Sequence, residues 1–133
     1  MLGKTLGDIF YYACFHFGPR TAIIYEDQEY SFNQLREKSL QLANSLQEIG
    51  LNKGDRISIL MPNCPEIIFV DYAVFKLGLV LIPQAAYLSA EDIIFRLEES
   101  DSCALVYHQS FKGVALEVKQ AYPRVKHFIC STD

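Results

Sequence analysis

The sequence predicts an α/β fold, with an open, mainly parallel sheet of about four strands, covering helices and a small β-hairpin near the N-terminus. Two short apolar runs, 56–61 and 79–82, flank a segment of helical length at 66–77. Two buried strands joined by a helix run parallel, so this part of the chain indicates an open sheet. Ligands of such sheets bind beyond the carboxyl ends of the strands, which are expected here at 62–65 and 83–87.

The first segment predicts an amphipathic helix followed by the hairpin. Thr5 can cap the helix with Asp8 three residues later, and apolar side chains recur at helical spacing until Gly18-Pro19 ends it. Residues 21–25 form a β-rich run, and after a short turn the chain returns at 29–30. These two runs are typical of a hairpin.

The next helix is predicted to begin after Ser31 and to end at Gly50. The Ser31 hydroxyl can accept a hydrogen bond from the amide of Gln34, whose side chain can reach back, which makes a capping box. In the central helix at 66–77, the charged residues follow one another at five-residue spacing and do not share one face. We therefore expect the central helix to be largely buried.

The last part of the chain continues the alternation of helices and strands. Ser89 caps a further helix, which Ser100-Asp101 ends. Residues 104–107 and 126–130 have strand character, and the weaker helix 111–122 lies between them. With 133 residues and no internal repeat or linker, we expect one domain spanning 1–133.

Composition and charge exclude several classes of protein. The net charge of −4 and the lack of a basic cluster argue against nucleic acid as a partner. No stretch approaches the roughly twenty apolar residues that span a bilayer. The four cysteines are far apart, which indicates neither a zinc site nor a disulfide framework but reduced, mostly buried thiols in a cytoplasmic protein.

Few polar residues qualify as catalytic candidates. The three histidines are scattered and lie in no hydrolase-like motif. Asp55 and Arg56 stand at the amino-terminal entrance of a strand, where a turn and an ion pair are expected. Glu66 suits the positive end of its helix. We therefore assign no catalytic residue and no metal ligand.

A series of short motifs follows one another along the chain: YSFNQL at 30–35, KGDRI at 53–57, MPNCPE at 61–66, FKLG at 75–78, LSAE at 88–91 and LEESD at 97–101. Their order and spacing resemble the amino-terminal part of the adenylate-forming (AMP-binding) superfamily, most of all acyl-CoA synthetases, and also luciferases and the adenylation domains of peptide synthetases. The resemblance covers roughly residues 5–130. Ala85-Ala86 departs from it, because members commonly carry Asn-Pro there.

The resemblance implies an ATP-dependent ligase that forms an acyl-adenylate from a carboxylic acid and passes the acyl group to a thiol. ATP, Mg and coenzyme A, or a carrier-protein thiol, are implied for the intact enzyme. The family's phosphate loop and catalytic lysine lie downstream of the matched region, and the glycines here never cluster into a phosphate cradle. The chain alone is therefore expected to bind no cofactor and to be inert.

Three residues are positional candidates for contacting ligands in the intact enzyme. Gln84 and Tyr87 come just past the carboxyl end of a strand, where substrate or thiol could lie. Lys112 follows the next strand and could meet a phosphate of coenzyme A. Gln84, Tyr87 and Lys112 are candidates for cofactor binding on the ground of their position alone.

Alternative functions stay open. The chain could be a free-standing, non-catalytic α/β module that binds a protein partner or a small ligand, or a flavodoxin-like nucleotide or redox domain. The ending at 131–133 without a closing helix favours an N-terminal piece of a larger enzyme. Its expected partner is the remainder of that enzyme. A homodimer is also expected, because apolar faces that the rest of the enzyme should cover would be exposed.

Overall fold

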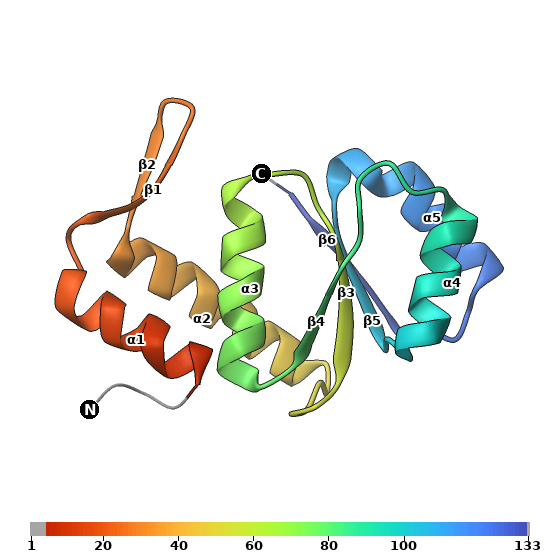
Figure 1. Cartoon of the computed structure of the whole chain (residues 1–133), viewed down its shortest axis with the longest axis horizontal. Helices are drawn as coiled ribbons and strands as arrows, with labels where there is room; N and C mark the ends of the chain where they lie inside the picture. Colours follow the sequence, from red (N-terminus) through yellow and green to blue (C-terminus); the bar gives the residue numbers. More distant parts are fainter. Residues whose placement is uncertain (1–4, 133) are drawn as a thin grey trace. The chain divides into compact units, whose positions relative to one another are not determined.

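The computed structural model describes residues 5–132, so the terminal Asp133 lies outside the described residues. It confirms the α/β class, with a four-stranded parallel sheet and a two-stranded antiparallel hairpin (Figure 1). The elements are, in chain order, α1 (Leu6–Phe17), β1 (Thr21–Tyr25), β2 (Gln28–Ser31), α2 (Phe32–Glu48), β3 (Arg56–Leu60), α3 (Pro65–Leu77), β4 (Val80–Pro83), α4 (Ala90–Ser100), β5 (Ala104–His108), the 3₁₀ turn η1 (Gln109–Phe111), α5 (Lys112–Ala121) and β6 (His127–Ser131). These elements belong to two compact units, one made of 5–53 with 64–79 and the other of 54–63 with 80–132.

The first unit contains α1, the β1–β2 hairpin, α2 and α3. Its core joins the three helices through Phe10 and Cys14 of α1, Leu35 of α2 and Phe69 of α3. The Phe10 ring stacks on Tyr72 of α3, with 3.6 Å between ring centroids. Aromatic packing thus fastens α1 to α3 inside this unit.

Hydrogen bonds at the helix ends match the sequence prediction. Thr5 and Asp8 form a capping box, in which each side chain accepts from the other residue's amide at 3.1 Å. Ser31 and Gln34 do the same for α2. Gly78 adopts the left-handed conformation that ends α3, with φ 68°.

All α3 residues except Lys76 are at least partly buried, which confirms the expectation that the central helix is largely buried.

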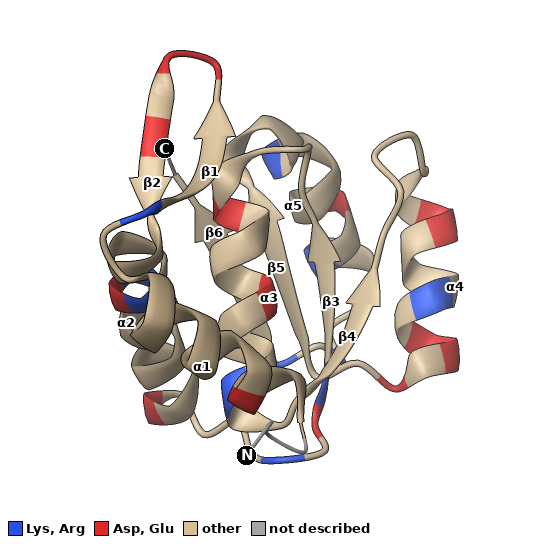
Figure 2. Ribbon diagram, turned by 60° about the vertical axis from the view of Figure 1, so that its left-hand side comes forward, with Lys and Arg blue, Asp and Glu red and all other residues tan. Residues whose placement is uncertain are grey.

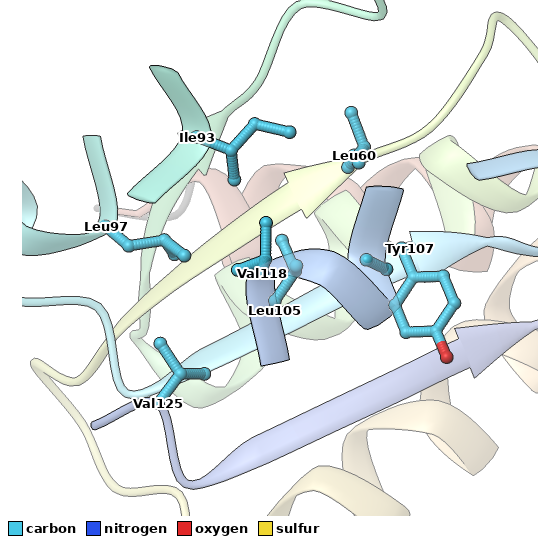
Figure 3. Close-up of a cluster of buried hydrophobic side chains, with 8 residues drawn as sticks. Leu60, Ile93, Leu97, Leu105, Tyr107, Val118 and Val125 are labelled. Carbon is cyan, nitrogen blue, oxygen red and sulfur yellow. The ribbon is translucent and has the colours of Figure 1, made fainter. Parts of the chain in front are cut away.

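The second unit contains the parallel sheet, with strand order β4-β3-β5-β6. Helices α4 and α5 pack on one face of it (Figure 3). The buried side chains of this cluster are Leu60, Ile93, Leu97, Leu105, Tyr107, Ala115, Val118 and Val125. Because β3 and β5 are central strands, nearly all their residues are buried, and they appear in the sequence as continuous apolar runs.

Two sequence expectations need correction. The chain between β5 and α5 makes the 3₁₀ turn η1 before α5 begins at Lys112, because the His108 side chain accepts a hydrogen bond from the Ser110 amide and caps that turn. The four cysteines are free, but Cys14 alone among them is buried, whereas Cys130 is exposed on β6.

Candidate functional site

The carboxyl ends of the parallel strands meet at one edge of the sheet (Figure 1). β3 ends there at Leu60, β4 at Pro83 and β5 at His108. Loops that leave this edge carry the ligand contacts of open α/β sheets. Gln84, Tyr87 and Lys112 all follow strands that end at this edge, as the sequence predicts.

Gln84 is buried rather than directed to solvent, with 6% of its surface exposed. Its backbone amide donates to the Ile59 carbonyl at 2.8 Å and so extends the β3–β4 ladder by one residue. Its side-chain Nε2 donates to Ser58 Oγ on β3 at 3.1 Å. Gln84 therefore ties the start of the loop after β4 to the neighbouring strand.

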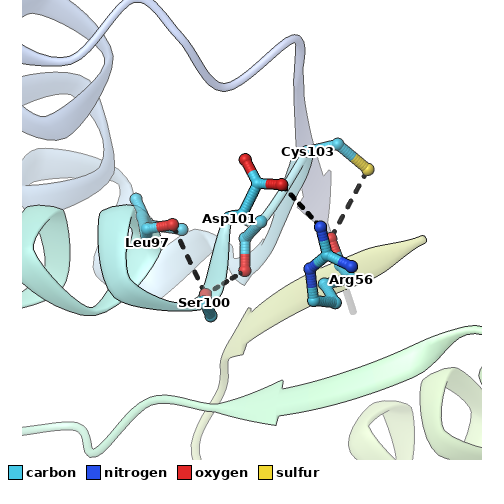
Figure 4. Close-up of polar contacts among 6 residues, drawn as sticks. Arg56, Leu97, Ser100, Asp101 and Cys103 are labelled. Atoms are coloured by element: carbon cyan, nitrogen blue, oxygen red, sulfur yellow. Dashed lines mark hydrogen bonds and ion pairs between the residues drawn. The ribbon is translucent and has the colours of Figure 1, made fainter. Parts of the chain in front are cut away.

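This hydrogen bond is the first of a polar chain, defined here as Gln84, Ser58, Ser102, Ser100 and the Leu97 carbonyl. Ser58 Oγ lies 3.0 Å from Ser102 Oγ, which lies 2.6 Å from Ser100 Oγ. Ser100 Oγ donates to the Leu97 carbonyl at the end of α4 (Figure 4). The polar chain links the loop after β4 to the last turn of α4.

The two ends of the polar chain fix its direction. Gln84 Nε2 can only donate and the Leu97 carbonyl can only accept, so each serine hydroxyl accepts one hydrogen bond and donates the next. All three hydroxyls are then satisfied, two of them on buried residues, Ser58 and Ser102, and the third on partly buried Ser100, which favours a rigid arrangement. The Gln84 Oε1 atom, in contrast, is buried without a hydrogen-bond partner among the described residues.

Tyr87 and Lys112 are placed differently from Gln84. Tyr87 stands in the loop after β4 with 88% of its surface exposed. Lys112 is the exposed first residue of α5. Among residues 5–132, no hydrogen bond or ion pair joins either side chain to Gln84. The structure thus leaves the two side chains open to solvent, and their ligand contacts stay a prediction.

The opposite edge of the sheet carries the predicted ion pair. Arg56 at the start of β3 binds the carboxylate of Asp101, which follows α4, with 2.6 Å between Nη2 and Oδ2 (Figure 4). The Cys103 thiol donates to the Arg56 carbonyl at 3.4 Å. Because 41% of the Arg56 side chain and 89% of the Asp101 side chain are exposed, this ion pair adds little to stability.

Thiol and metal chemistry find little support in the structure. Burial raises the pKa of the Cys14, Cys64 and Cys103 thiols above the usual value, which keeps them in the less nucleophilic thiol form. Within residues 5–132, no group of three or more His, Cys, Asp or Glu side chains could hold a metal ion. No helix in the same range is long and apolar enough to cross a bilayer.

His108 is a buried polar residue at the functional edge that the sequence does not single out for a role. Its Nδ1 accepts from the Ser110 amide at 3.2 Å and lies 2.7 Å from Ser110 Oγ. The ring therefore shapes the turn between β5 and α5.

The sequence pattern of the AMP-binding enzyme family matches residues 10–132. The chain belongs to this family. It is 30% identical over 122 residues to the crotonobetaine/carnitine–CoA ligase of Escherichia coli, a match that covers 88% of this chain and 24% of that protein. The chain thus spans about a quarter of the length of the relatives it matches.

Solved structures of AMP-binding enzymes share this fold. Coronafacic acid ligase from Pectobacterium brasiliense superimposes with a TM-score of 0.90 at 26% identity, over 96% of this chain and 25% of that one. The N-terminal domain of FACL13 from Mycobacterium tuberculosis gives a TM-score of 0.89 at 25% identity, over 97% of this chain and 34% of that domain. The resemblance seen in the sequence motifs is therefore confirmed.

The glycines with a left-handed backbone conformation are spread over separate parts of the chain. A phosphate cradle needs clustered backbone amides, commonly held by several glycines in one loop. The glycines with positive φ, Gly50, Gly54 and Gly78, end separate helices or form a separate turn. At the carboxyl ends of the strands, the Gln84 side-chain amide donates to Ser58 Oγ.

Proposed function

We propose that the chain is the N-terminal scaffold part of an acyl-CoA synthetase-like ligase, which uses ATP and Mg to adenylate a carboxylic acid and passes the acyl group to coenzyme A or a carrier-protein thiol. The observation that carries the proposal is the family match over residues 10–132. The similar proteins include a crotonobetaine/carnitine–CoA ligase and coronafacic acid ligase, which supports the ligase class.

In this proposal, the chain supplies a rigid sheet edge rather than reacting groups. Gln84 fixes the loop after β4 through Ser58, and exposed Tyr87 and Lys112 are the proposed contacts to substrate, thiol or phosphate. Pyrophosphate departure requires cations and amide donors around the phosphates, each worth several kcal/mol of barrier. We propose that the chain is inert alone, because no glycine-rich phosphate loop is found among the residues that the structure describes.

The proposal also concerns partners and location. We regard residues 1–133 as one subdomain that works with the remainder of the ligase and with a carboxylic acid substrate. Four free thiols suit a reducing compartment, which supports a cytoplasmic enzyme. We also propose that the ligase takes part in fatty acid metabolism. Exposed apolar side chains support self-association as a further property.

The test compares the chain with the longer protein that its gene would encode. Isothermal titration of the isolated chain with ATP and Mg should give no saturable binding, and the longer protein should catalyse ATP–pyrophosphate exchange with mixed carboxylic acids. Micromolar ATP binding by the chain alone would contradict its inertness. A stop codon after Asp133, together with no exchange, would reject the ligase proposal in favour of a free-standing module.

A further inference from the structure

The loop between β4 and α4, residues 84–89, is the segment that carries Tyr87. It contains no Lys, Arg, Asp or Glu, so no ion pair can hold it (Figure 2). A backbone hydrogen bond from the Leu88 amide to the Ala85 carbonyl, at 3.2 Å, closes the turn within it. The position of the loop therefore depends on how its two ends are attached.

The end of the loop that leads into α4 is attached without the polar chain. The Ser89 hydroxyl caps α4 by accepting a hydrogen bond from the Asp92 amide at 3.1 Å. Partly buried Leu88 packs against the hydrophobic cluster that includes Leu97. The polar chain holds the other end of the loop, at Gln84.

Gln84 has few alternatives to its place in the polar chain. It follows β4, which is an edge strand of the four-stranded sheet, so β3 is its one neighbouring strand. Because its Oε1 has no partner among residues 5–132, the hydrogen bond to Ser58 Oγ holds the side-chain amide. Ser58 is 0% exposed, so water cannot replace a partner that it loses.

The Ser58 hydroxyl needs an acceptor for its own proton, and Ser102 Oγ lies 3.0 Å away. Without Ser102 Oγ, the Ser58 proton either stays unpaired or turns to Gln84 Oε1. The second arrangement requires a half-turn of the Gln84 amide, which leaves Nε2 unpaired instead. In each arrangement one buried polar group has no partner, and this cost is relieved when Gln84 detaches into water.

We propose that Ser102 is a positioning residue for the loop 84–89, and so for Tyr87, and that it acts through Ser58 and Gln84. The loop, α4 and the polar chain form a closed ring, because α4 follows the loop and Ser102 comes two residues after the helix ends. The ligand contact of Tyr87 rests on the proposed function. The effect of Ser102 on the loop does not.

Hydrogen exchange of the isotope-labelled chain, followed residue by residue with NMR, tests this role. Ser102→Ala should accelerate exchange of the Gln84 and Leu88 amides by at least about fivefold, because the loop opens to relieve an unpaired buried group. The Tyr122 amide closes the last turn of α5 in the same unit and is the internal reference. Its exchange should change by less than about twofold.

Three further variants separate positioning from a general loss of stability. Ser102→Cys fills the same space with a weaker acceptor and should give the same local acceleration without a cavity. Gln84→Met already releases the loop from Ser58, so adding Ser102→Ala to it should change Leu88 exchange by less than about twofold. The matched control is Ser45→Ala, which removes an exposed hydroxyl from α2 and should leave the loop unchanged.

Three outcomes would overturn the proposal. The first is wild-type exchange of the Gln84 and Leu88 amides in both Ser102 variants. The second is an equal acceleration at Tyr122, which would show that the whole unit is destabilised. The third is a full effect of Ser102→Ala in the presence of Gln84→Met, which would show that Ser102 acts by another route. None of these outcomes depends on ATP–pyrophosphate exchange, so failure of the ligase proposal is recognised separately.

Discussion

Gln84 and Ser58 are polar residues whose role depends on their buried neighbours. Ser58 interrupts the continuous apolar run of β3 and is completely buried, where a hydroxyl requires partners. It finds them in Gln84 and Ser102, which are distant in sequence. Gln84 thus acts as a positioning residue for the loop that carries Tyr87.

Removal of the Gln84 amide should destabilise the chain. Gln84→Ala takes away the donor to Ser58 and leaves a cavity, so the free energy of unfolding should fall by about 1–3 kcal/mol in urea denaturation. Gln84→Met keeps most of the volume and should cost less. The control is Gln120→Ala, because Gln120 is exposed on α5. Equal stability of the Gln84→Ala and Gln120→Ala variants would show that the polar chain contributes nothing.

Asp71 on α3 should make stability depend on pH. Burial raises its pKa from 3.8 to about 6, so the folded state holds this proton more tightly than the unfolded chain does. Its contribution is therefore fully present below pH 3.8 and declines as pH rises through about 6. Asp71→Asn removes the charge and, allowing for solvent screening of a half-buried group, should stabilise the chain by about 1 kcal/mol near pH 7.5.

Urea denaturation of Asp71→Asn and wild type at several pH values measures this effect. The gain should shrink towards pH 4, where both side chains are neutral in the folded state. The exposed Asp27 in the hairpin turn provides the control, as Asp27→Asn. A gain that is the same at every pH would contradict the assignment to the Asp71 proton.

At the level of elements, short local signals account for the helix ends. Ser89 and Asp92 make the third capping box of the chain, at the start of α4. Asp101 adopts a left-handed conformation with φ 50° and ends α4, as the break after Ser100 predicts. Helix α4 has one apolar stripe, and Leu97 in this stripe is completely buried against the sheet. The position of α4 on the sheet therefore depends on a few apolar side chains.

Leu97→Ala should loosen the second unit. The loss of a fully buried leucine typically costs about 2–5 kcal/mol, because a cavity remains after the methyl groups are gone. Hydrogen exchange should accelerate in β3 and β5, which pack against α4 through Leu60 and Leu105. Phe95→Ala on the exposed side of α4 should change exchange little. Unchanged exchange in both strands of Leu97→Ala would show that α4 does not stabilise the sheet.

At the level of the whole molecule, the region that matches the family does not follow the division of the chain into two compact units. The family match runs almost from end to end, across the boundary between the units. The chain spans about a quarter of the length of its relatives. Within residues 5–132, the structure shows a polar chain that joins the loop after β4 to the end of α4.

The sequence by itself determined the order of elements, the capping boxes and the parallel sheet, because helix caps and apolar periodicity act over three to five residues. It also placed Gln84 just after the carboxyl end of a strand. Only the tertiary structure decided that Gln84 points back to Ser58 and that Ser102 and Ser100 continue the polar chain. These contacts join residues up to 44 positions apart. The sequence around one residue does not determine which strand will lie beside it, so such contacts could not be predicted.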